Sequence, residues 1–475
     1  MPLPNFTFKL IKSILPAAVF AAALGFSLPA NAQLSGVMTA ETFSQLMSVA
    51  EDRGVVRVIV GLDVPTTVEG DLTDDQVASQ QAMIASAQGV LAGTFGADTV
   101  VRNFQSVPYS ALSVTAAQLE TLQTMTGITS VVEDTLAAPT LDVSTRVINA
   151  HRMWNRGFDG TGYSVAVLDT GISYQNQAFL PRPSVIANSS CFSTTSAAFG
   201  STSACNGGVA SDVGRQSAPA ASLAIDGAGH GTHVAGIVAS RAPQALRGVA
   251  HDARLVPIQV FSIFSVASGY CSGGIECMLS WSSDQMAGLD RVNVWVNRYG
   301  IASVNMSLGG GQYFATCDSS NPGYAAIVTN LRSRGVAVVV SSGNNGYTTS
   351  TGAPGCYSGA TTVGATDDVD NIASFSNQAT AIVNLMAPGV GIRAAYPAFR
   401  RTTAGLSGTS MAAPHVAGAF AIMREIWPTA TVDQLETVLR CTGTAVTRAG
   451  TPGTFYRIDL LIAWQYARNQ IVPSC

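Results

Sequence analysis

The sequence predicts an α/β protein with a mostly parallel sheet and helices on both faces, preceded by a small α+β unit. The chain has 475 residues, of which 47% are hydrophobic and 11% charged, so it can bury a large core. From about residue 149 onward, apolar β-forming runs alternate with helix-length segments, as in parallel strands joined by crossover helices. The expected strands are Ser164–Leu168, Arg254–Phe261, Ala302–Met306, Val336–Ser341, Thr361–Val363 and Ile382–Met386.

Residues 1–32 predict a secretory signal peptide. Lys9 and Lys12 form a basic start, an apolar run extends from Ile14 to Leu28, and Ala30-Asn31-Ala32 offers an A-x-A cleavage site. A membrane anchor is the alternative, but the run is shorter than the roughly 20 residues that a spanning helix needs. We therefore expect export, with no membrane attachment after the signal is removed.

Residues 33–140 predict a separate small domain with its core at about 55–138. Val55–Val60 is a β-rich run, and Thr73-Asp74-Asp75-Gln76 opens a helix with a capping-box pattern. The helix ending near Ala92 is followed by further expected elements, and this alternation of strands and helices favours a ferredoxin-like fold. Those elements are a strand at Ser110–Val114, a helix at Thr115–Met125 and a strand at Ile128–Val132.

Residues 133–146 contain few core-forming side chains and predict a linker. The large domain is expected to span 141–475 and to end with a helix near Arg457–Ala467. Two segments inside it, Ser173–Ser222 and Ser262–Trp281, read as surface loops closed by disulfides.

Charge is distributed unevenly between the two parts of the chain. Residues 33–138 hold 3 Arg and 12 acidic residues, whereas residues 139–475 hold 20 Arg and 17 acidic residues. An acidic segment joined to a weakly basic one favours docking between them, although both surfaces can also be simply solvated. No basic cluster indicates nucleic-acid binding.

All eight cysteines lie after residue 190. An even number in an exported chain predicts disulfides, although eight cysteines allow 105 pairings. We expect neighbours to pair. A metal site is the weaker alternative because no two cysteines have C-x₂-C spacing. The expected pairs are Cys191–Cys205, Cys271–Cys277, Cys317–Cys356 and Cys441–Cys475.

Three residues predict acyl-transfer chemistry. Asp169 ends the apolar run Val165–Leu168, which places a carboxylate at the carboxyl end of a buried strand, where it can fix the tautomer of a histidine. His230 lies among glycines that allow close backbone approach. Ser410 precedes a helix with Pro414 in its first turn, so its backbone N–H is available to bind an oxyanion. In isolation, Asp169 reads more readily as a turn or helix-cap residue, and Ser410 can be read as an ordinary N-cap.

His230 and His233 have the spacing of a metal pair, but no H-E-x-x-H arrangement accompanies them. The segments Val165–Gly171, Gly229–Gly236 and Gly408–His415 together resemble the subtilase family of serine endopeptidases. The order Asp, His, Ser is the subtilisin order, distinct from those of chymotrypsin and the α/β-hydrolases. The resemblance is strong over residues 150–467 and weaker over 55–138.

The resemblance implies a subtilisin-like three-layer αβα fold and a catalytic triad of Asp169, His230 and Ser410. In the family pattern the second histidine, His233, is structural, and the Asn after Gly343 donates from its side chain to the oxyanion. We assign that role to Asn344, with its neighbour Asn345 as the alternative.

The segment Ser307-Leu308-Gly309-Gly310 matches the subtilase stretch that pairs with substrate backbone and walls the first specificity pocket. Backbone pairing tolerates many substrate sequences. Gly309 and Gly310 leave room for a large side chain, so we expect a preference for bulky apolar P1 residues.

The resemblance also implies that residues 33–140 are a propeptide that chaperones and inhibits its own peptidase domain. The enzyme is expected to cut itself between Asp134 and Asp142. The Asp-Gly-x-Gly-His form of residues 226–230 is similar to the proteinase K branch. That branch has a strong calcium site whose Asp corresponds to Asn384 here, and Asn can ligate calcium but brings no charge. The cluster Asp367–Asp370 is an alternative calcium locus but reads more readily as a solvated turn, so a structural calcium is possible without a located site.

These expectations describe a secreted, monomeric serine endopeptidase of protein or peptide substrates, with no cofactor in its chemistry. An inactive scaffold and an esterase or transpeptidase are the competing functions. Serine-directed phosphonate labelling and the ratio of peptide to ester turnover would distinguish them.

Overall fold

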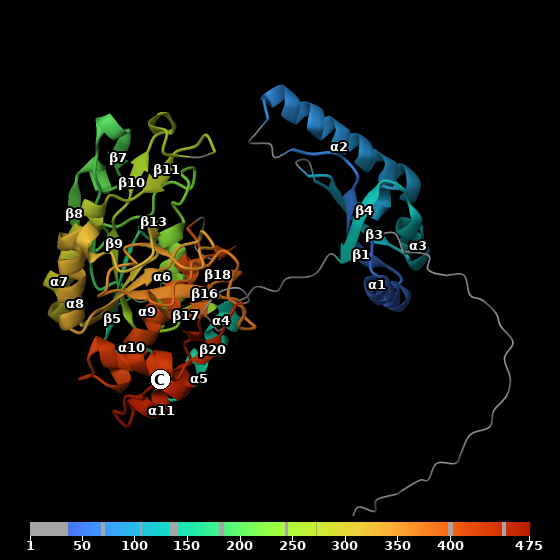
Figure 1. Cartoon of the computed structure of the whole chain (residues 1–475). Helices are drawn as coiled ribbons and strands as arrows, with labels where there is room; N and C mark the ends of the chain where they lie inside the picture. The colour runs from blue at the N-terminus through green and yellow to red at the C-terminus, as the bar shows by residue number, and fades with distance from the viewer. Residues whose placement is uncertain are drawn as a thin grey trace, which may run out of the picture. The chain divides into compact units, whose positions relative to one another are not determined.

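The computed structural model describes residues 37–67, 72–104, 107–133, 141–179, 185–242, 246–271, 273–397, 402–448 and 453–475. The chain separates into two compact units, Met1–Ala137 and Ala138–Cys475 (Figure 1). The expected signal peptide, and all of the expected cleavage window except Leu141 and Asp142, lie outside the described residues.

The first unit is an antiparallel four-stranded sheet in the order β2-β3-β1-β4. Its β1-α2-β2-β3-α3-β4 succession is the ferredoxin-like order, preceded by one more helix, α1. The capping box at Thr73 and Gln76 is confirmed, and α3 begins with another at Thr115 and Gln118. The elements are α1 (Ala40–Arg53), β1 (Val56–Leu62), α2 (Asp74–Phe95), β2 (Val100–Asn103), β3 (Tyr109–Val114), α3 (Ala116–Thr124) and β4 (Ile128–Glu133).

The second unit is built on a ten-stranded sheet. All neighbours from β21 to β6 are parallel, and antiparallel β20 and β8 close the two edges. The α/β prediction is therefore confirmed. In sheet order the strands are β20 (Thr444–Val446), β21 (Phe455–Arg457), β17 (Val383–Pro388), β16 (Thr361–Thr366), β14 (Ala337–Ser341), β12 (Ile301–Met306), β5 (Ser164–Asp169), β9 (Arg254–Gln259), β6 (Ser189–Phe192) and β8 (Ser211–Gly214).

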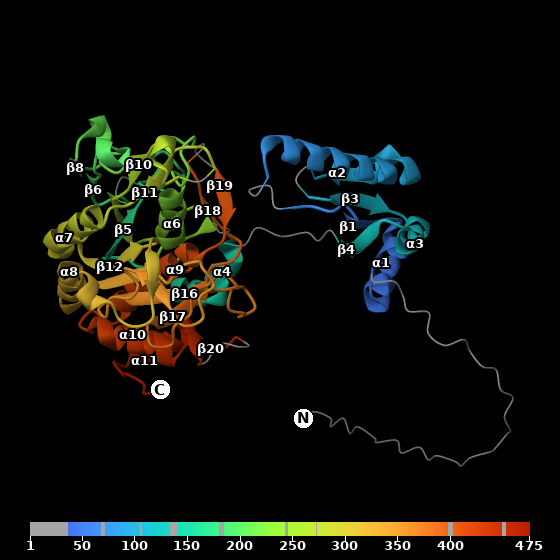
Figure 2. The same ribbon diagram turned by 45° about the horizontal axis from the view of Figure 1, so that its top comes forward.

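Helices cover both faces of this sheet, and the figures show α7 and α8 together on one side (Figures 1 and 2). The side chains of β5 show why three layers form. Val165 and Val167 pack with α6 and α9, whereas Ala166 and Leu168 pack with α7 and α8. The same alternation directs the next residue, Asp169, toward α6 and α9. The helices are α4 (Leu141–Val147), α5 (Ala150–Trp154), α6 (His230–Ala239), α7 (Ser282–Tyr299), α8 (Pro322–Ser333), α9 (Thr409–Ile426), α10 (Val432–Cys441) and α11 (Leu460–Ala467).

The expected disulfide pairs are all present. The two segments read as surface loops are more ordered than expected, because they contribute strands. Cys191 is fully buried in β6 of the main sheet, so the first segment is not merely a loop. Sequence alone missed these strands because they are only three or four residues long and most of them contain Ser. The smaller sheets consist of β7 (Ser201–Ser203), β10 (Ser262–Phe264) and β11 (Cys277–Leu279), then β13 (Gly310–Tyr313) with β15 (Thr351–Ala353), and β18 (Ile392–Ala395) with β19 (Thr403–Leu406).

The expected linker is also corrected at its carboxyl end, where residues 141–147 form α4. Ser144 is fully buried and Thr145 nearly so, which anchors this short helix to the second unit. Ser144 Oγ donates to His415 Nε2 at 2.9 Å. Among the described residues, no helix is both long enough and apolar enough to cross a membrane.

Candidate active site

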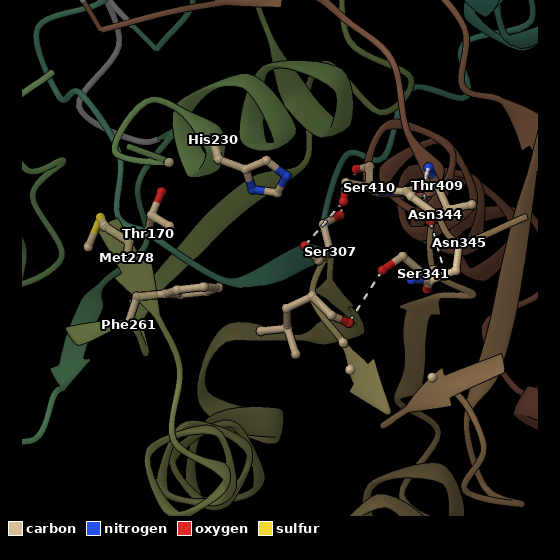
Figure 3. A pocket seen from close by; sticks show the side chains of 16 residues that line it. Thr170, His230, Phe261, Met278, Ser307, Ser341, Asn344, Asn345, Thr409 and Ser410 are labelled. Atoms are coloured by element: carbon tan, nitrogen blue, oxygen red, sulfur yellow. Dashed lines mark hydrogen bonds between the residues drawn. The ribbon is translucent and has the colours of Figure 1, made fainter. Parts of the chain in front are cut away.

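A cavity of about 430 Å³ opens at the carboxyl edge of the main sheet, where parallel sheets of this kind commonly bind ligands. The loops after β12 and β14, the start of α6 and the start of α9 all reach it (Figure 3). None of the side chains that line it is acidic, lysine or arginine. The expected site residues lining the cavity are His230, Ser307, Leu308, Gly309, Gly310, Asn344 and Ser410.

Asp169 lies behind the cavity wall and holds His230. Its side chain is 1% exposed, and its Oδ1 accepts a 2.8 Å hydrogen bond from His230 Nδ1. Oδ1 also accepts the N–H of Thr170 at 2.7 Å. A carboxylate beside Nδ1 requires the proton on that nitrogen, so Nε2 is the free base.

Glycine makes the approach between Asp169 and His230 possible. A Cβ at Gly231, in the first turn of α6, would lie 2.3 Å from the carbonyl oxygen of Gly171. The glycines after Asp169 and after His230 therefore let the strand end and the helix start touch.

The pKa of His230 is set by two opposing effects. Burial lowers it, because a charged imidazolium loses solvation. The negative charge of Asp169 and the hydrogen bond to it raise it, and together they leave the pKa above 6.5. Asp169 therefore stabilises the protonated form of His230.

Ser410 lies in the first turn of α9, where backbone N–H groups have no partner within the helix. Pro414 has no N–H to donate to the Ser410 carbonyl four residues earlier. That carbonyl instead accepts a 2.7 Å hydrogen bond from Ser307 Oγ. Asn305 Nδ2 donates to Ser307 Oγ at 2.9 Å and fixes it in place.

The hydrogen bond of the Ser410 hydroxyl goes to the Ser307 backbone rather than to His230. The hydroxyl donates to the carbonyl oxygen of Ser307 at 3.4 Å, which is a long contact (Figure 3). Figure 3 shows the His230 imidazole and Ser410 in the same cavity.

Asn344 and Asn345 differ in their hydrogen-bond partners. Asn344 Oδ1 accepts both the N–H of Thr409 at 2.8 Å and its hydroxyl at 2.9 Å. The amide NH₂ of Asn344 is thereby left to donate elsewhere. Asn345 is instead held by Asn377, through its backbone N–H at 3.0 Å and its side-chain oxygen at 3.3 Å. This difference favours Asn344 as the oxyanion donor.

Two neighbouring strands wall the part of the cavity reached by Ser307–Gly310. β13 and β15 pair antiparallel, with Gly310 opposite Ala353. A Cβ at Gly309 would lie 3.0 Å from the carbonyl oxygen of Ala353, so the two walls are close. The Cys317–Cys356 disulfide joins the segments that follow these two strands.

Sequence reasoning missed three contributors to the site. Thr409 orients Asn344, as described above. Phe261 and Met278 line the cavity opposite the Ser307 segment. Phe261 follows the end of β9, beside β5, so the rule that parallel strands end at one edge could have identified it.

The other histidines lie outside the cavity and have structural partners. His233 Nε2 is 3.0 Å from the carbonyl oxygens of Ile392 and Ala404, which joins α6 to the β18–β19 hairpin. Burial lowers its pKa to about 4. Burial also lowers the pKa of His415 to about 4. Both rings are therefore neutral at pH 7.

The calcium locus implied at Asn384 does not fit a calcium ion. Its Oδ1 accepts the N–H of Thr362 at 2.7 Å, and its Nδ2 donates to Glu436 at 3.0 Å. Arg332 lies 3.1 Å from the same carboxylate and already supplies positive charge. The positive charge of the Arg332 guanidinium therefore balances the negative charge of the Glu436 carboxylate.

At the Asp367–Asp370 locus, Asp367 and Asp370 are satisfied by protein groups, whereas Asp368 Oδ1 is buried without a hydrogen-bond partner in the part of the chain that the structure describes. Asp370 forms two hydrogen bonds with Arg457, at 2.8 and 2.9 Å, and Asp367 accepts backbone N–H groups of its own turn. Among the described residues, a metal-compatible group does exist at Asp159, His251 and Asp252. Arg241 pairs with Asp252 at 3.1 Å, and its positive charge would repel a metal ion there. We therefore assign no metal to this group.

An αβα sheet with Asp, His and Ser around one edge cavity defines a serine-hydrolase type of site. A family model described as "Subtilase family" matches residues 160–455, and the chain belongs to this family. Subtilases need no cofactor for catalysis, and this protein is a serine endopeptidase.

Several proteases are similar to this chain in sequence over 200 residues or more. An alkaline protease of Alkalihalobacillus alcalophilus is 29% identical over 416 residues, covering 87% of this chain and 92% of the relative. Subtilisin Savinase of Lederbergia lenta is 35% identical over 300 residues, covering 63% and 90%. An extracellular serine proteinase of Thermus sp. (strain Rt41A) is 37% identical over 213 residues, covering 44% and 45%. A solved protease structure from Pseudoalteromonas arctica PAMC 21717 superposes with a TM-score of 0.53 at 26% identity, covering 67% of this chain and 94% of that one.

Proposed function

We propose that this protein is a secreted, self-processing serine endopeptidase in which Ser410 is the nucleophile, His230 the general base and Asp169 the orienting carboxylate. The observation that carries the proposal is the 2.8 Å bond between Asp169 and His230 Nδ1, beside a cavity that also contains Ser410 and Asn344. Asp169 keeps Nε2 unprotonated and directed into the site.

Catalysis then follows from these positions. His230 Nε2 takes the Ser410 proton as Oγ attacks the substrate carbonyl carbon, and Asp169 stabilises the imidazolium that forms. His230 returns the proton to the leaving amine. Water, deprotonated by His230, hydrolyses the acyl-enzyme and restores Ser410.

The oxyanion formed in each step is stabilised by two donors. The backbone N–H of Ser410 is at the start of α9, where it has no helical partner. The NH₂ of Asn344 is free because its oxygen faces Thr409. Donors fixed before the reaction stabilise developing charge without reorganisation.

Substrate selection is proposed to be broad in sequence, with a preference for bulky apolar P1 side chains. The segment Ser307–Gly310 is proposed to pair with the substrate backbone, which reads no side chains. The absence of charged side chains among the residues lining the cavity supports an apolar P1 group.

Export and activation are proposed from the order of the segments along the chain. Residues 1–32 are the signal peptide, and residues 33–140 are the inhibitory propeptide, cut near residues 134–142. The buried position of Ser144 supports a cut before it, because a cut beyond it would free an anchored segment. The mature enzyme is proposed to be a monomer nearest the proteinase K branch.

The test is intact-mass analysis of the wild type and Ser410→Ala after exposure to a fluorophosphonate. We expect a wild-type fragment that begins near residue 140 and carries one adduct. The Ser410→Ala chain should stay full length, apart from the signal peptide, and unlabelled. Efficient cutting of the Ser410→Ala chain at the same junction, without other proteases, would refute self-processing by Ser410.

A further inference from the structure

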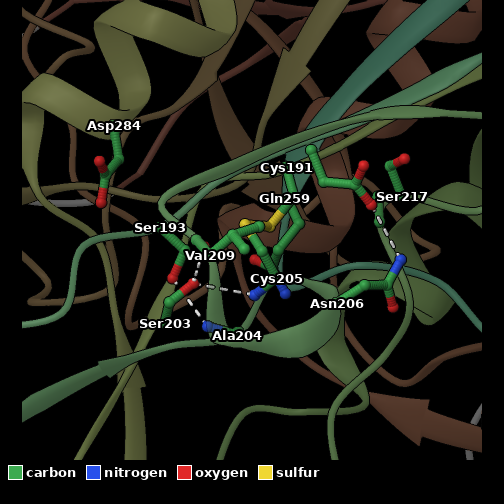
Figure 4. Close-up of a disulfide and its surroundings, with 12 residues drawn as sticks. Cys191, Ser193, Ser203, Ala204, Cys205, Asn206, Val209, Ser217, Gln259 and Asp284 are labelled. Carbon is green, nitrogen blue, oxygen red and sulfur yellow. Dashed lines mark hydrogen bonds between the residues drawn. A yellow bond between two sulfur atoms is a disulfide. The ribbon is translucent and has the colours of Figure 1, made fainter.

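A small lobe of the second unit combines exposed aromatic side chains with tight anchoring. It consists of β7, β10 and β11, which pair in the order β11-β10-β7, together with the segments that flank them (Figure 1). The Cys191–Cys205 disulfide fastens it to the main sheet (Figure 4). The Cys271–Cys277 disulfide closes its other end.

Hydrogen bonds hold the lobe against the wall of the catalytic cavity. Ser193 Oγ donates to the carbonyl oxygen of Phe261, a cavity residue, at 2.9 Å. The buried carboxylate of Asp284, in the first turn of α7, accepts both the N–H and the hydroxyl of Thr194, at 3.0 and 2.9 Å. The lobe is therefore a rigid extension of the cavity wall.

Four aromatic rings contact one another across the lobe, and we call them the aromatic ladder. Phe199 packs edge-on against Trp281 at 5.2 Å between ring centroids. Trp281 contacts Phe264 at 5.7 Å, and Phe264 contacts Tyr270 at 5.6 Å. Of the two inner rings, Phe264 is 4% exposed, whereas the end rings Phe199 and Tyr270 are 47% and 54% exposed.

The surroundings of the ladder hold few charges, and residues 255–284 contain two charged residues, the exposed Glu276 and the buried Asp284. No Asp, Glu, Lys or Arg occurs in residues 183–211 or in residues 255–275. Val266 and Leu279 add further exposed apolar surface in the same lobe. Exposed apolar surface without interspersed charge is typical of a binding site rather than of a solvated face.

The lobe that carries the ladder borders the substrate cleft, although no ladder ring itself lines either cavity. Trp281 is flanked by Ser280 and Ser282, which line a second cavity of about 390 Å³. This second cavity shares Phe261 and the Leu308–Gly310 wall with the catalytic cavity. A polypeptide that extends from the catalytic cavity through the second one therefore reaches the segment Leu279–Ser282, which contains Trp281.

We propose that the aromatic ladder is an exosite for an apolar, uncharged stretch of protein substrate that lies beyond the residues around the scissile bond. This inference rests on the proposed function. Aromatic side chains bind such stretches by burying apolar area on both partners. A membrane surface is disfavoured because the lobe offers no cation near the ladder for anionic headgroups.

The test uses two quenched fluorescent peptides with the same residues around the scissile bond. One continues into an apolar, uncharged segment and the other into a Ser- and Glu-rich segment of equal length. The extensions are placed on the N-terminal and the C-terminal side of the scissile bond in separate pairs. Wild type should show a KM about five- to tenfold lower for one apolar extension.

The test variant is Phe199→Ser with Tyr270→Ser in the full chain. It should lose this KM difference while its kcat and its KM for the unextended peptide stay unchanged. Val294→Ser is the matched control, because Val294 is 63% exposed on α7, outside the lobe. Fluorophosphonate titration and thermal unfolding, measured on each variant, show whether it is folded and active. If the double variant unfolds, the single variants Phe199→Ser and Tyr270→Ser replace it.

Equal KM values for the paired peptides in wild type, or a difference that survives the ladder variants, would overturn the exosite. So would binding to phosphatidylcholine vesicles that the variants lose while peptide KM values stay the same, since the ladder would then serve a membrane. Failure of the proposed function looks different, because the wild type would then cleave no peptide and take no phosphonate label.

Discussion

Ser307 Oγ donates a 2.7 Å hydrogen bond to the carbonyl oxygen of Ser410, the residue we propose as nucleophile. The bond replaces the one that Pro414 cannot make, because proline has no N–H for the carbonyl four residues before it. One side chain in the predicted substrate-binding segment thus also supports the turn that presents Ser410. The pair connects the wall of the cavity to its catalytic helix.

A double-mutant cycle tests this relationship. Ser307→Ala should reduce stability by about 1 kcal/mol and lower kcat, because it leaves a buried carbonyl without a donor. Pro414→Ala supplies an N–H to that carbonyl, so Ser307→Ala should cost clearly less in the Pro414→Ala background. The measurements are kcat and the free energy of unfolding for all four chains. Strictly additive effects would show that the Ser307 bond does not compensate for Pro414.

Asn344→Leu should lower kcat by about 10²–10³ with little change in KM, which is the effect of removing one side-chain oxyanion donor from a subtilisin. Asn345→Leu is the matched control, because this neighbour is held by Asn377 and not by Thr409. Steady-state kinetics on one peptide substrate measures both. A larger loss of kcat in Asn345→Leu than in Asn344→Leu would reverse the assignment.

The sequence predicted the α/β layers for a physical reason, because buried parallel strands are continuous apolar runs and polar residues at their ends, such as Asp169, gather at one edge. The roles of His230, Ser410 and Asn344 were instead expected from the resemblance to the subtilase motifs. The short strands of the small lobe escaped prediction, since β10 forms by pairing with both β7 and β11, and β7 and β10 contain polar residues. The helix at 141–147 escaped for a similar reason. It is stabilised by burial of Ser144 against His415, a contact 271 residues apart in sequence.

The hydrogen-bond partner of each side chain also could not be predicted from the sequence. Nothing local indicates that Thr409, rather than a neighbour, orients Asn344, because the two are 65 residues apart. Asn384 resembled a calcium ligand in its motif, but its amide pairs with Glu436. Motifs locate chemistry-bearing residues, whereas tertiary packing decides which hydrogen bonds they make.

Activity is expected to decline as the pH falls, and the midpoint of this decline is expected above pH 6.5. Catalysis needs His230 unprotonated, and Asp169 raises the pKa of this histidine above its usual value. The pH profile of kcat/KM should therefore show an acidic limb with its midpoint above 6.5. In Asp169→Asn the charge is lost, so activity should fall by about 10⁴ and the limb should shift to lower pH. An unchanged midpoint in Asp169→Asn would show that another group governs the limb.

Stability is expected to fall as the pH drops from about 6.5 to 4. Burial lowers the pKa of His233 and of His415 to about 4, so the unfolded chain binds more protons than the folded chain in this window. Each ring then contributes about 3 kcal/mol at neutral pH that is lost on acidification. Urea unfolding of Ser410→Ala, which avoids self-digestion, measures the trend.

His415→Asn supplies the control for that measurement. Asparagine can keep polar contacts in this buried place but does not titrate, so the slope of stability against pH should decrease by about one proton. The raised pKa of Glu425 acts in the opposite direction and is common to both chains. Equal slopes in the two chains would show that His415 is not neutral in the folded state.

The Cys317–Cys356 disulfide is expected to determine selectivity as well as stability. Cys317 N–H donates to the carbonyl oxygen of Cys356 at 3.0 Å, so the bond clamps the segments that follow β13 and β15, the two pocket walls. Replacing both cysteines by serine should raise KM for bulky P1 substrates several-fold and leave KM for P1 Ala nearly unchanged. Cys441→Ser with Cys475→Ser is the matched control, because the sequence separations of 39 and 34 residues predict similar losses of about 4 kcal/mol in the chain-entropy model. Peptides that differ only at P1, assayed below the unfolding temperature of each variant, measure the effect. The same change of P1 selectivity in both pairs would mean that general loosening, rather than the clamp on the pocket, sets the preference.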